Sequence, residues 1–284
     1  MAVKLLLIQA LSSLHAGTGQ GVGAIDLPIA RERATELPLV PGSTIKGCIR
    51  DNYGEQPDTA TIFGAEERQG QVQIGDARLL LLPVRCLGAT FMWTTSPYVL
   101  RRLKRDAEAA KCDEALDEIA ELAEGKSVVA SPESLIDLGG SKRLVLEDFD
   151  FDTTIDATNA WAKWIADRLY PAKEDEVWRK EFLKRFAIID DRSFQFLVRH
   201  ATEVQAHVKI DHELGTVDKK EGGLWYQESL PAETVLVSIL RVDERRGNAK
   251  QAWSAVNKGA HLQVGGKATT GHGLVRVVLV GGQA

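Results

Sequence analysis

The chain has 284 residues, of which 44% are apolar and 26% are charged, and its formal charge is −5. These values are ordinary for a globular protein and exclude a fully disordered chain, a collagen and a coiled coil. The longest apolar stretch, residues 79–84, is too short to span a membrane, and the N-terminus lacks a signal-peptide cleavage pattern. The three cysteines (Cys48, Cys86, Cys112) lie far apart, which argues against a disulfide framework or a cysteine zinc site and favours a reducing cytoplasm.

The charge is unevenly distributed along the chain. Residues 77–105 and 245–284 each contain six basic residues and no acid. Residues 106–191 contain 22 acids against 11 bases, a net of −11, which leaves +6 for the rest of the chain. Such a pattern suits a protein with one basic surface that faces an anion. Solvent-exposed helices that happen to be mostly basic or mostly acidic would give the same charge distribution.

In chain order, the first predicted elements are a strand, a long loop and a helix. Residues 3–10 form a short apolar run that is typical of a buried strand. Residues 12–41 are rich in glycine and proline, and a loop of thirty residues in a compact domain usually has a function. A helix is predicted over residues 43–52, with Ser43 as its N-cap. Strands over residues 72–84 and 89–94 and a basic helix over residues 98–105 follow.

The acidic middle of the chain is predicted to be mainly helical. Helical patterns cover residues 111–124, 157–170 and 173–186, and Pro171 separates the last two. We therefore expect residues 106–191 to form a helical insertion.

The last third of the chain returns to strand patterns. Residues 201–210 and 224–230 flank Gly215 and Gly222, which predicts a long hairpin. A strand over residues 234–242, a helix over 250–258 and strands over 261–264 and 274–280 complete the chain. The order β, α, β, β, insertion, β, α, β predicts an α+β fold with a ferredoxin-like sheet.

A glycine-rich stretch with a single carboxylate follows the first strand. Gly19, Gly21 and Ala24 fit the loose G-x-G-x-x-A dinucleotide pattern, but Pro28 opposes the helix that such a site requires. Asp26 is the only acid before Glu32. A lone carboxylate in this setting suits a turn cap, a general base or a metal ligand, and the spacing does not decide between them.

Two further segments suggest phosphate binding. The helix that begins near Ser43 carries Lys46 and Arg50 four residues apart on one face, which suits either a phosphate site or a solvated surface helix. The loop over residues 265–273 offers glycines, threonines and a lysine, so it suits phosphate contact or a simple connection between strands. The histidines form no zinc spacing, and there is no GxSxG elbow.

Together these motifs resemble the RAMP superfamily of CRISPR proteins, in which a G-S-x-x-K-G-x-x-R helix follows the first strand and a glycine-rich loop lies near the C-terminus. Within it, the chain is similar to the backbone subunits of type III-B effectors, the Cmr complexes. The matching stretches run from end to end of the chain and are specific as a set: residues 15–19, 25–32, 41–50, 93–100, 201–204, 223–231 and 264–273.

The resemblance implies an RRM-like palm over residues 1–105 and 232–284, the insertion over 106–191 and a protruding thumb over 192–231. Copies of such a subunit stack along a guide RNA (crRNA) beside other effector subunits. Each thumb displaces a base pair, and the target RNA is cut at regular intervals. The cleaving aspartate of the family corresponds to Asp26, which would act as base or as ligand of a divalent metal (Mg²⁺ or Mn²⁺).

Other residues receive expected roles from the same resemblance. His15, Tyr226 and Glu228 are secondary candidates for acid–base or positioning roles. The expected guide contacts are Thr18, Ser43, Lys46, Arg50, Gly265, Gly266, Lys267, Thr269, Thr270 and Gly271. Two alternatives stay open: a non-catalytic RNA-binding scaffold, and a RAMP endoribonuclease that processes guide precursors through His15. A nucleotide-dependent enzyme is more distant.

Overall fold

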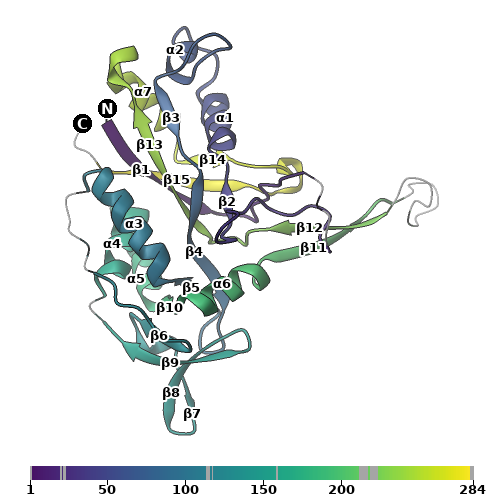
Figure 1. The fold of residues 1–284 in the computed structure, drawn as a ribbon, viewed down its shortest axis with the longest axis vertical. Helices are drawn as coiled ribbons and strands as arrows, with labels where there is room; N and C mark the ends of the chain where they lie inside the picture. Colours follow the sequence, from purple (N-terminus) through teal and green to yellow (C-terminus); the bar gives the residue numbers. More distant parts are fainter. Residues whose placement is uncertain are drawn as a thin grey trace.

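The computed structural model describes residues 2–19, 21, 24–112, 116, 118–157, 159–210, 217 and 223–281. At its centre, four antiparallel strands follow the order β15-β1-β13-β4 (Figure 1). They are β1 (Ala2–Ala10), β4 (Ala77–Arg85), β13 (Val235–Val242) and β15 (Leu274–Val280). This order is that of a ferredoxin-like sheet, so the predicted α+β palm is confirmed.

Helices cover both faces of the central sheet. On one face, α1 (Gly42–Tyr53) packs against α7 (Ala249–Val256), and Lys4 of β1 lies over the Trp253 ring of α7. Gln9 of β1 instead donates to the hydroxyl of Tyr170, just after α4 (Ala160–Leu169), at 2.9 Å. Because successive side chains of a strand point to opposite faces, α7 and α4 lie on opposite sides of the sheet.

Short elements complete the palm. α2 (Thr59–Phe63) follows α1, and α3 (Pro97–Ala109) packs on β1 and β4. β2 (Leu39–Val40) pairs with β4, β3 (Val72–Ile74) with β13, and β14 (His261–Gln263) with β15. The strands predicted over residues 72–84, 261–264 and 274–280 are thus confirmed, the first of them as two strands, β3 and β4.

The middle of the chain extends the same sheet and is not purely helical. Beyond β4 the strand order continues β5-β10-β6-β9-β8-β7. The strands are β5 (Phe91–Thr95), β6 (Lys126–Val129), β7 (Ile136–Leu138), β8 (Ser141–Leu146), β9 (Phe149–Ile155) and β10 (Phe186–Ile189). The expectation that residues 106–191 are mainly helical is therefore wrong, while the division of the chain into palm, insertion and thumb stays a prediction.

The helix predicted over residues 111–124 is also wrong. α3 runs on to Ala109, and residues 116 and 118–123 have no regular secondary structure. Leu116 nevertheless belongs to the core, and Ile119 and Leu122 pack against it. The apolar spacing of these residues is typical of a helix face, but tertiary packing buries them in an irregular segment. The other two helices are confirmed as α4 and α5 (Glu176–Lys184), and Phe186 begins β10.

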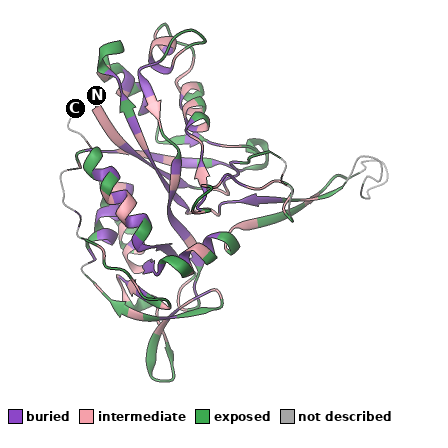
Figure 2. Ribbon diagram, in the orientation of Figure 1, coloured by how far each residue is buried: buried purple, intermediate pink, exposed green. Residues whose placement is uncertain are grey.

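The thumb hairpin leaves the body of the molecule as a separate two-stranded ribbon (Figure 1). β11 (Glu203–Val208) and β12 (Leu224–Ser229) pair in an antiparallel register from Glu203↔Ser229 to Val208↔Leu224. α6 (Asp191–His200) leads directly into β11. The hairpin is confirmed, and Gly215 and Gly222 lie outside the described residues. In Figure 2 the outer part of the ribbon is exposed, and only the inner end of β12 is buried.

Candidate functional site

The long loop after β1 crosses the root of the thumb and is fastened at two places, one on β12 and one at the residue that follows it. Leu14 and Leu230 exchange backbone hydrogen bonds of 2.8 and 2.9 Å. Leu27 donates its N–H to the carbonyl of Tyr226 at 3.0 Å and accepts the N–H of Glu228 at 3.0 Å. The loop therefore adds a short parallel partner to the inner end of β12, so its position depends on that of the thumb.

Asp26 lies at the second of these places. Its carboxylate Oδ2 accepts the backbone N–H of Tyr226 at 2.8 Å, and its carbonyl accepts the N–H of Gly21 at 2.8 Å. The side chain is exposed. Within the described part of the chain, Oδ1 makes no hydrogen bond. The side chain therefore bonds the thumb strand instead of capping its own turn, and it keeps a second carboxylate oxygen that can face a ligand.

His15 is held behind the loop rather than presented to solvent. Its Nδ1 lies 2.6 Å from the carbonyl oxygen of Glu228, and only 7% of the residue is exposed. A Cβ on Gly17 would lie 2.6 Å from Nε2, so glycine is required for this close approach. This burial does not favour His15 as the nucleophile-activating group of a free-standing processing enzyme.

Tyr226 and Glu228 lie on β12 with different surroundings. Tyr226 is 39% exposed. The carboxylate of Glu228 is buried and accepts hydrogen bonds from the Ile29 N–H, the Arg31 guanidinium and the Thr202 hydroxyl. Tyr226 bonds the Asp26 carboxylate through its backbone N–H, and Glu228 bonds the neighbouring Leu27 through its own. The catalytic roles of the two side chains stay predictions.

The glycine-rich loop of the C-terminus packs directly on the segment that carries His15. Gly266 donates its N–H to the carbonyl of His15 at 2.9 Å, and Gly273 donates to the carbonyl of Ser13 at 2.8 Å. A Cβ on Gly265, where φ is +80°, would lie 2.4 Å from the His15 carbonyl oxygen. The candidate contact residues of this loop are exposed or half-buried: Gly265, Gly266, Lys267, Thr269, Thr270 and Gly271.

Helix α1 lies beside the same loop. A backbone group of Gly265 hydrogen-bonds the Cys48 thiol, whose pKa is raised by burial. Lys46 and Arg50 are half-buried on this helix, and burial, followed by repulsion from Arg50, lowers the pKa of Lys46. An anionic ligand would offset both effects by pairing with the ammonium group.

Ser43 does not cap α1 as expected. The N-cap residue is Pro41, with no side-chain cap, and the N–H of Gly42 is bound instead by Oδ1 of Asp76 at 2.8 Å. The Ser43 side chain is left exposed at the first turn, as is Thr18 in the first loop. The three motifs of the sequence are therefore linked in space through residues 13–17 and Gly265, although the first and the third lie at opposite ends of the chain.

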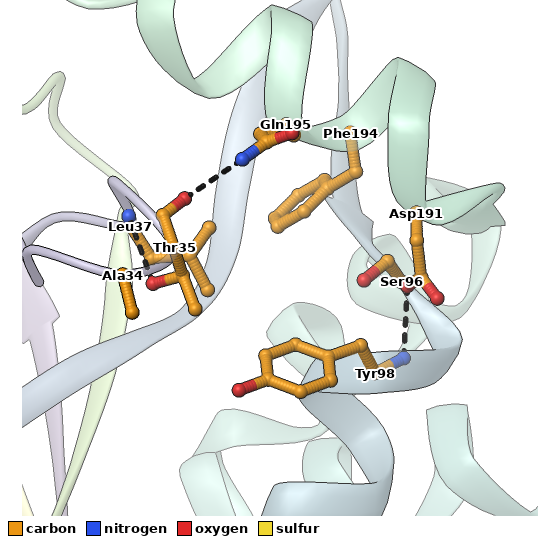
Figure 3. A pocket seen from close by; sticks show the side chains of 8 residues that line it. All are labelled: Ala34, Thr35, Leu37, Ser96, Tyr98, Asp191, Phe194 and Gln195. Atoms are coloured by element: carbon orange, nitrogen blue, oxygen red, sulfur yellow. Dashed lines mark hydrogen bonds between the residues drawn. The ribbon is translucent and has the colours of Figure 1, made fainter.

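A cavity of about 280 Å³ lies between the loop over residues 34–37 and the N-terminal ends of α3 and α6 (Figure 3). There the Gln195 amide donates to the carbonyl of Thr35 at 3.1 Å, and Asp191 accepts the N–H of Tyr98 at 2.9 Å. None of the residues expected to bind RNA lines this cavity. The bond from Gln195 to Thr35 instead attaches α6 to the loop that follows Asp26.

Sequence patterns missed the residues that hold this loop in place. Arg31, Thr202 and Val198 are brought to Glu228 or its neighbours only by the fold. Arg31 lies in a family-like stretch, but nothing in its spacing identified a buried partner nearly two hundred residues away.

Among the described residues, no group of three or more His, Cys, Asp or Glu side chains could hold a metal ion. In the parts of the chain placed by the structure, no helix is long and apolar enough to cross a membrane.

Comparison with known proteins identifies the family. The profile of the RAMP superfamily matches residues 7–276. The chain belongs to the RAMP superfamily. Within that superfamily it is 34% identical to the CRISPR system Cmr endoribonuclease Cmr4 of Pyrococcus furiosus, over 98% of this chain and 96% of the relative. It is 22% identical to the CRISPR system CMR subunit Cmr4 of Saccharolobus solfataricus, over 97% of this chain and 96% of that protein.

Solved RAMP structures share the whole fold. The crystal structure of oligomeric Cmr4 from Pyrococcus furiosus has a TM-score of 0.78 and 28% identity, with 100% of both chains covered. A chain of the type III-B Cmr-beta complex bound to cognate target RNA has a TM-score of 0.74 over 98% of this chain and 97% of its own. At 19% identity, this second likeness shows the fold alone.

Proposed function

We propose that this RAMP protein is the backbone subunit of a type III-B CRISPR effector, which binds a guide RNA and cleaves complementary target RNA. The observation that carries the proposal is the exposed Asp26 carboxylate on a loop fastened to the root of the thumb. The full-length relative named as a Cmr endoribonuclease supports the same activity. Its partners would be the guide, the target, further copies of this chain and the other effector subunits.

The chemistry needs little from the protein beyond position and charge. The 2′-hydroxyl of the target attacks the adjacent phosphorus, a P–O2′ bond forms and the P–O5′ bond breaks. The products are a 2′,3′-cyclic phosphate and a 5′-hydroxyl, because a base takes the 2′-OH proton and the departing 5′-oxygen takes a proton from water. A nucleotide displaced from the duplex can reach the in-line geometry, which a regular helix does not allow. Asp26 lies beside the strand that would displace it.

The donor set fits a divalent metal that is shared with RNA. Mg²⁺ is usually held by one or two carboxylates together with phosphates and waters, and Asp26 offers one exposed carboxylate oxygen. When bound, such an ion would stabilise the charge that develops on the phosphate. The role of Asp26 would then be to orient it or to accept the hydroxyl proton.

Guide binding is assigned to α1 and the C-terminal glycine-rich loop. Lys46, Arg50 and Lys267 supply positive charge, and the exposed backbone of residues 265–271 allows close approach of phosphates. Contacts of this kind do not read sequence, so one subunit can bind any guide.

The test is cleavage by the reconstituted guide-loaded complex, with Asp26→Asn beside wild type and with magnesium or a chelator. We expect evenly spaced cuts that vanish in the variant and with the chelator, while guide binding is unchanged. Cuts that persist in Asp26→Asn would assign the chemistry to another subunit and leave this chain as a scaffold.

A further inference from the structure

A partly buried ion pair lies five residues beyond Asp26. The Nη2 atom of Arg31 lies 2.5 Å from Oε1 of Glu228, whose side chain is only 4% exposed. The Nη1 atom of the same guanidinium donates to the carbonyl oxygens of Glu36, at 2.9 Å, and of Val198, at 3.3 Å. One side chain therefore joins the loop, the inner strand of the thumb and the last turn of α6.

The Glu228 carboxylate is fully engaged by this arrangement. Besides Arg31, Oε1 accepts the hydroxyl of Thr202 at 2.9 Å, and Oε2 accepts the N–H of Ile29 at 3.1 Å. A buried carboxylate is costly unless it is paired and hydrogen-bonded, and here a cation and two neutral donors satisfy it. The planar fork of arginine can bind a carboxylate and carbonyls at once, which a lysine cannot match.

The contacts converge on the root of the thumb, where β11 begins and β12 ends. Thr202 immediately precedes β11, Glu228 is in β12, and Val198 is in the helix that leads into β11. The loop beyond Arg31 is fastened to the same helix by Gln195 (Figure 3), and Arg199 lies 3.5 Å from Glu36. We call the Arg31–Glu228 pair, with the bonds of Thr202 and Val198 to it, the clamp. On its other side, Leu27 and Asp26 are bonded to Tyr226.

We propose that Arg31 is a positioning residue that fixes Asp26 against the root of the thumb, with Glu228 as its anchor. The inference rests on the proposed function and adds the element that sets the geometry of cutting. Without the Arg31 guanidinium, the loop keeps its contacts at Leu27 but loses its direct bonds to Glu228 of β12 and to Val198 of α6. A misplacement of about 1 Å at a reacting centre costs roughly 100-fold in rate.

The experiment measures single-turnover cleavage at saturating target, together with guide and target affinity, in the guide-loaded complex. Arg31→Ala should slow cleavage by roughly 100-fold, with both affinities within about twofold of wild type. The cleavage rate of Arg31→Lys should lie between those of wild type and Arg31→Ala. Arg33→Ala is the matched control, because Arg33 is an exposed cation of the same loop with no bond to the thumb among the described residues. It should cleave at the wild-type rate.

Two further variants separate position from proton transfer and from folding. Glu228→Gln should slow cleavage without changing the shape of the pH–rate profile, whereas loss of one limb of the profile would make Glu228 an acid or base and overturn the proposal. If Arg31→Ala fails to assemble, Thr202→Val removes one bond of the clamp without leaving a buried charge. It should slow cleavage severalfold, and a wild-type rate there would overturn the proposal.

The Asp26→Asn complex distinguishes failure of the clamp from failure of the proposed function. If Asp26→Asn is inactive and Arg31→Ala cleaves at the wild-type rate, the clamp is wrong and the proposed function stands. If Asp26→Asn still cleaves, the proposed function fails for this subunit, and with it the role of Arg31. A loss in Arg33→Ala equal to that in Arg31→Ala would show a general effect of loop charge and would also overturn the clamp.

Discussion

Asp26 and Tyr226 are 200 positions apart in the chain, and the carboxylate of the first accepts the backbone N–H of the second at 2.8 Å. The same two segments also exchange backbone hydrogen bonds through Leu27. The candidate cleaving residue is thus bound to the strand that would displace a base pair of the guide–target duplex. A shift of the thumb would carry Asp26 with it, which couples the cut to the displaced nucleotide.

This hydrogen bond can be tested apart from catalysis. Asp26→Asn retains a carbonyl oxygen that can accept the Tyr226 N–H, whereas Asp26→Ala does not. We expect the Tyr226 amide to exchange its hydrogen slowly in wild type and in Asp26→Asn, and about fivefold faster in Asp26→Ala, the factor that corresponds to ~1 kcal/mol for one hydrogen bond. Equal exchange in all three proteins would show that the carboxylate does not hold the loop.

Lys46 and Arg50 should contribute to guide affinity through phosphates alone. Each substitution by alanine is expected to weaken binding equally for guides of unrelated sequence. Each should also lower the slope of log K against log salt by about 0.7, the value for one phosphate contact on a single strand. Lys142→Ala, on the distant β7–β8 hairpin, is the control, because Lys142 is exposed outside the proposed RNA surface. An unchanged slope in Lys46→Ala and Arg50→Ala would remove α1 from the guide-binding surface.

The palm strands could be predicted from the sequence, while the middle of the chain could not. β1 and β13 are apolar runs that are mostly buried in the centre of the sheet, so composition alone identifies them. β6 and β9 pair with each other in parallel across more than twenty residues, and no local pattern encodes such a pairing. The apolar spacing of Leu116, Ile119 and Leu122 fits a helix, yet packing against the core decided otherwise.

The candidate site shows the same division. Asp26 and the two phosphate-binding segments stood out by residue type and spacing, and the resemblance assigned their roles. The partners of Glu228 could not be found in this way, because Arg31, Thr202 and Ile29 come together only when the loop packs against the thumb. A lone glutamate on a strand gives no sign in the sequence of whether it is exposed for chemistry or buried as an anchor.

Gly265 should be intolerant of a side chain, in contrast to Gly271. Both have positive φ, +80° and +85°, so alanine costs about 1 kcal/mol at either position. Only at Gly265 would the new Cβ also meet backbone, at 2.4 Å from the His15 carbonyl oxygen; at Gly271 nothing lies within 4 Å. Gly265→Ala should therefore lower both Tm and guide affinity further than Gly271→Ala. Equal effects of the two substitutions would show that the loop does not need its close contact with His15.

Glu233 lies in the turn between the thumb and β13, within a buried polar cluster. Its Oε2 accepts the Gln9 amide at 2.7 Å, and its carbonyl accepts the indole N–H of Trp93 at 2.9 Å. The Gln9 amide also donates to the hydroxyl of Tyr170. Burial raises the pKa of Glu233 above its ordinary value of 4.5, despite the favourable bond from Gln9. Burial, and next the neighbouring Glu233, also raises the pKa of Tyr170.

The raised pKa of Glu233 predicts a stability that falls as the pH rises from about 4 to neutrality. In this window the folded protein retains the proton that the unfolded chain has released, so deprotonation favours unfolding. Glu233→Gln keeps an oxygen for the Gln9 amide and cannot ionise. We expect its Tm to exceed that of wild type by about 2 °C at pH 7.5, and the two values to converge near pH 4. Glu67→Gln, at an exposed loop position, removes the same charge and should change Tm little at either pH. A Glu233→Gln protein that is no more stable than wild type at pH 7.5 would show that the carboxylate carries no burial cost at the root of the thumb.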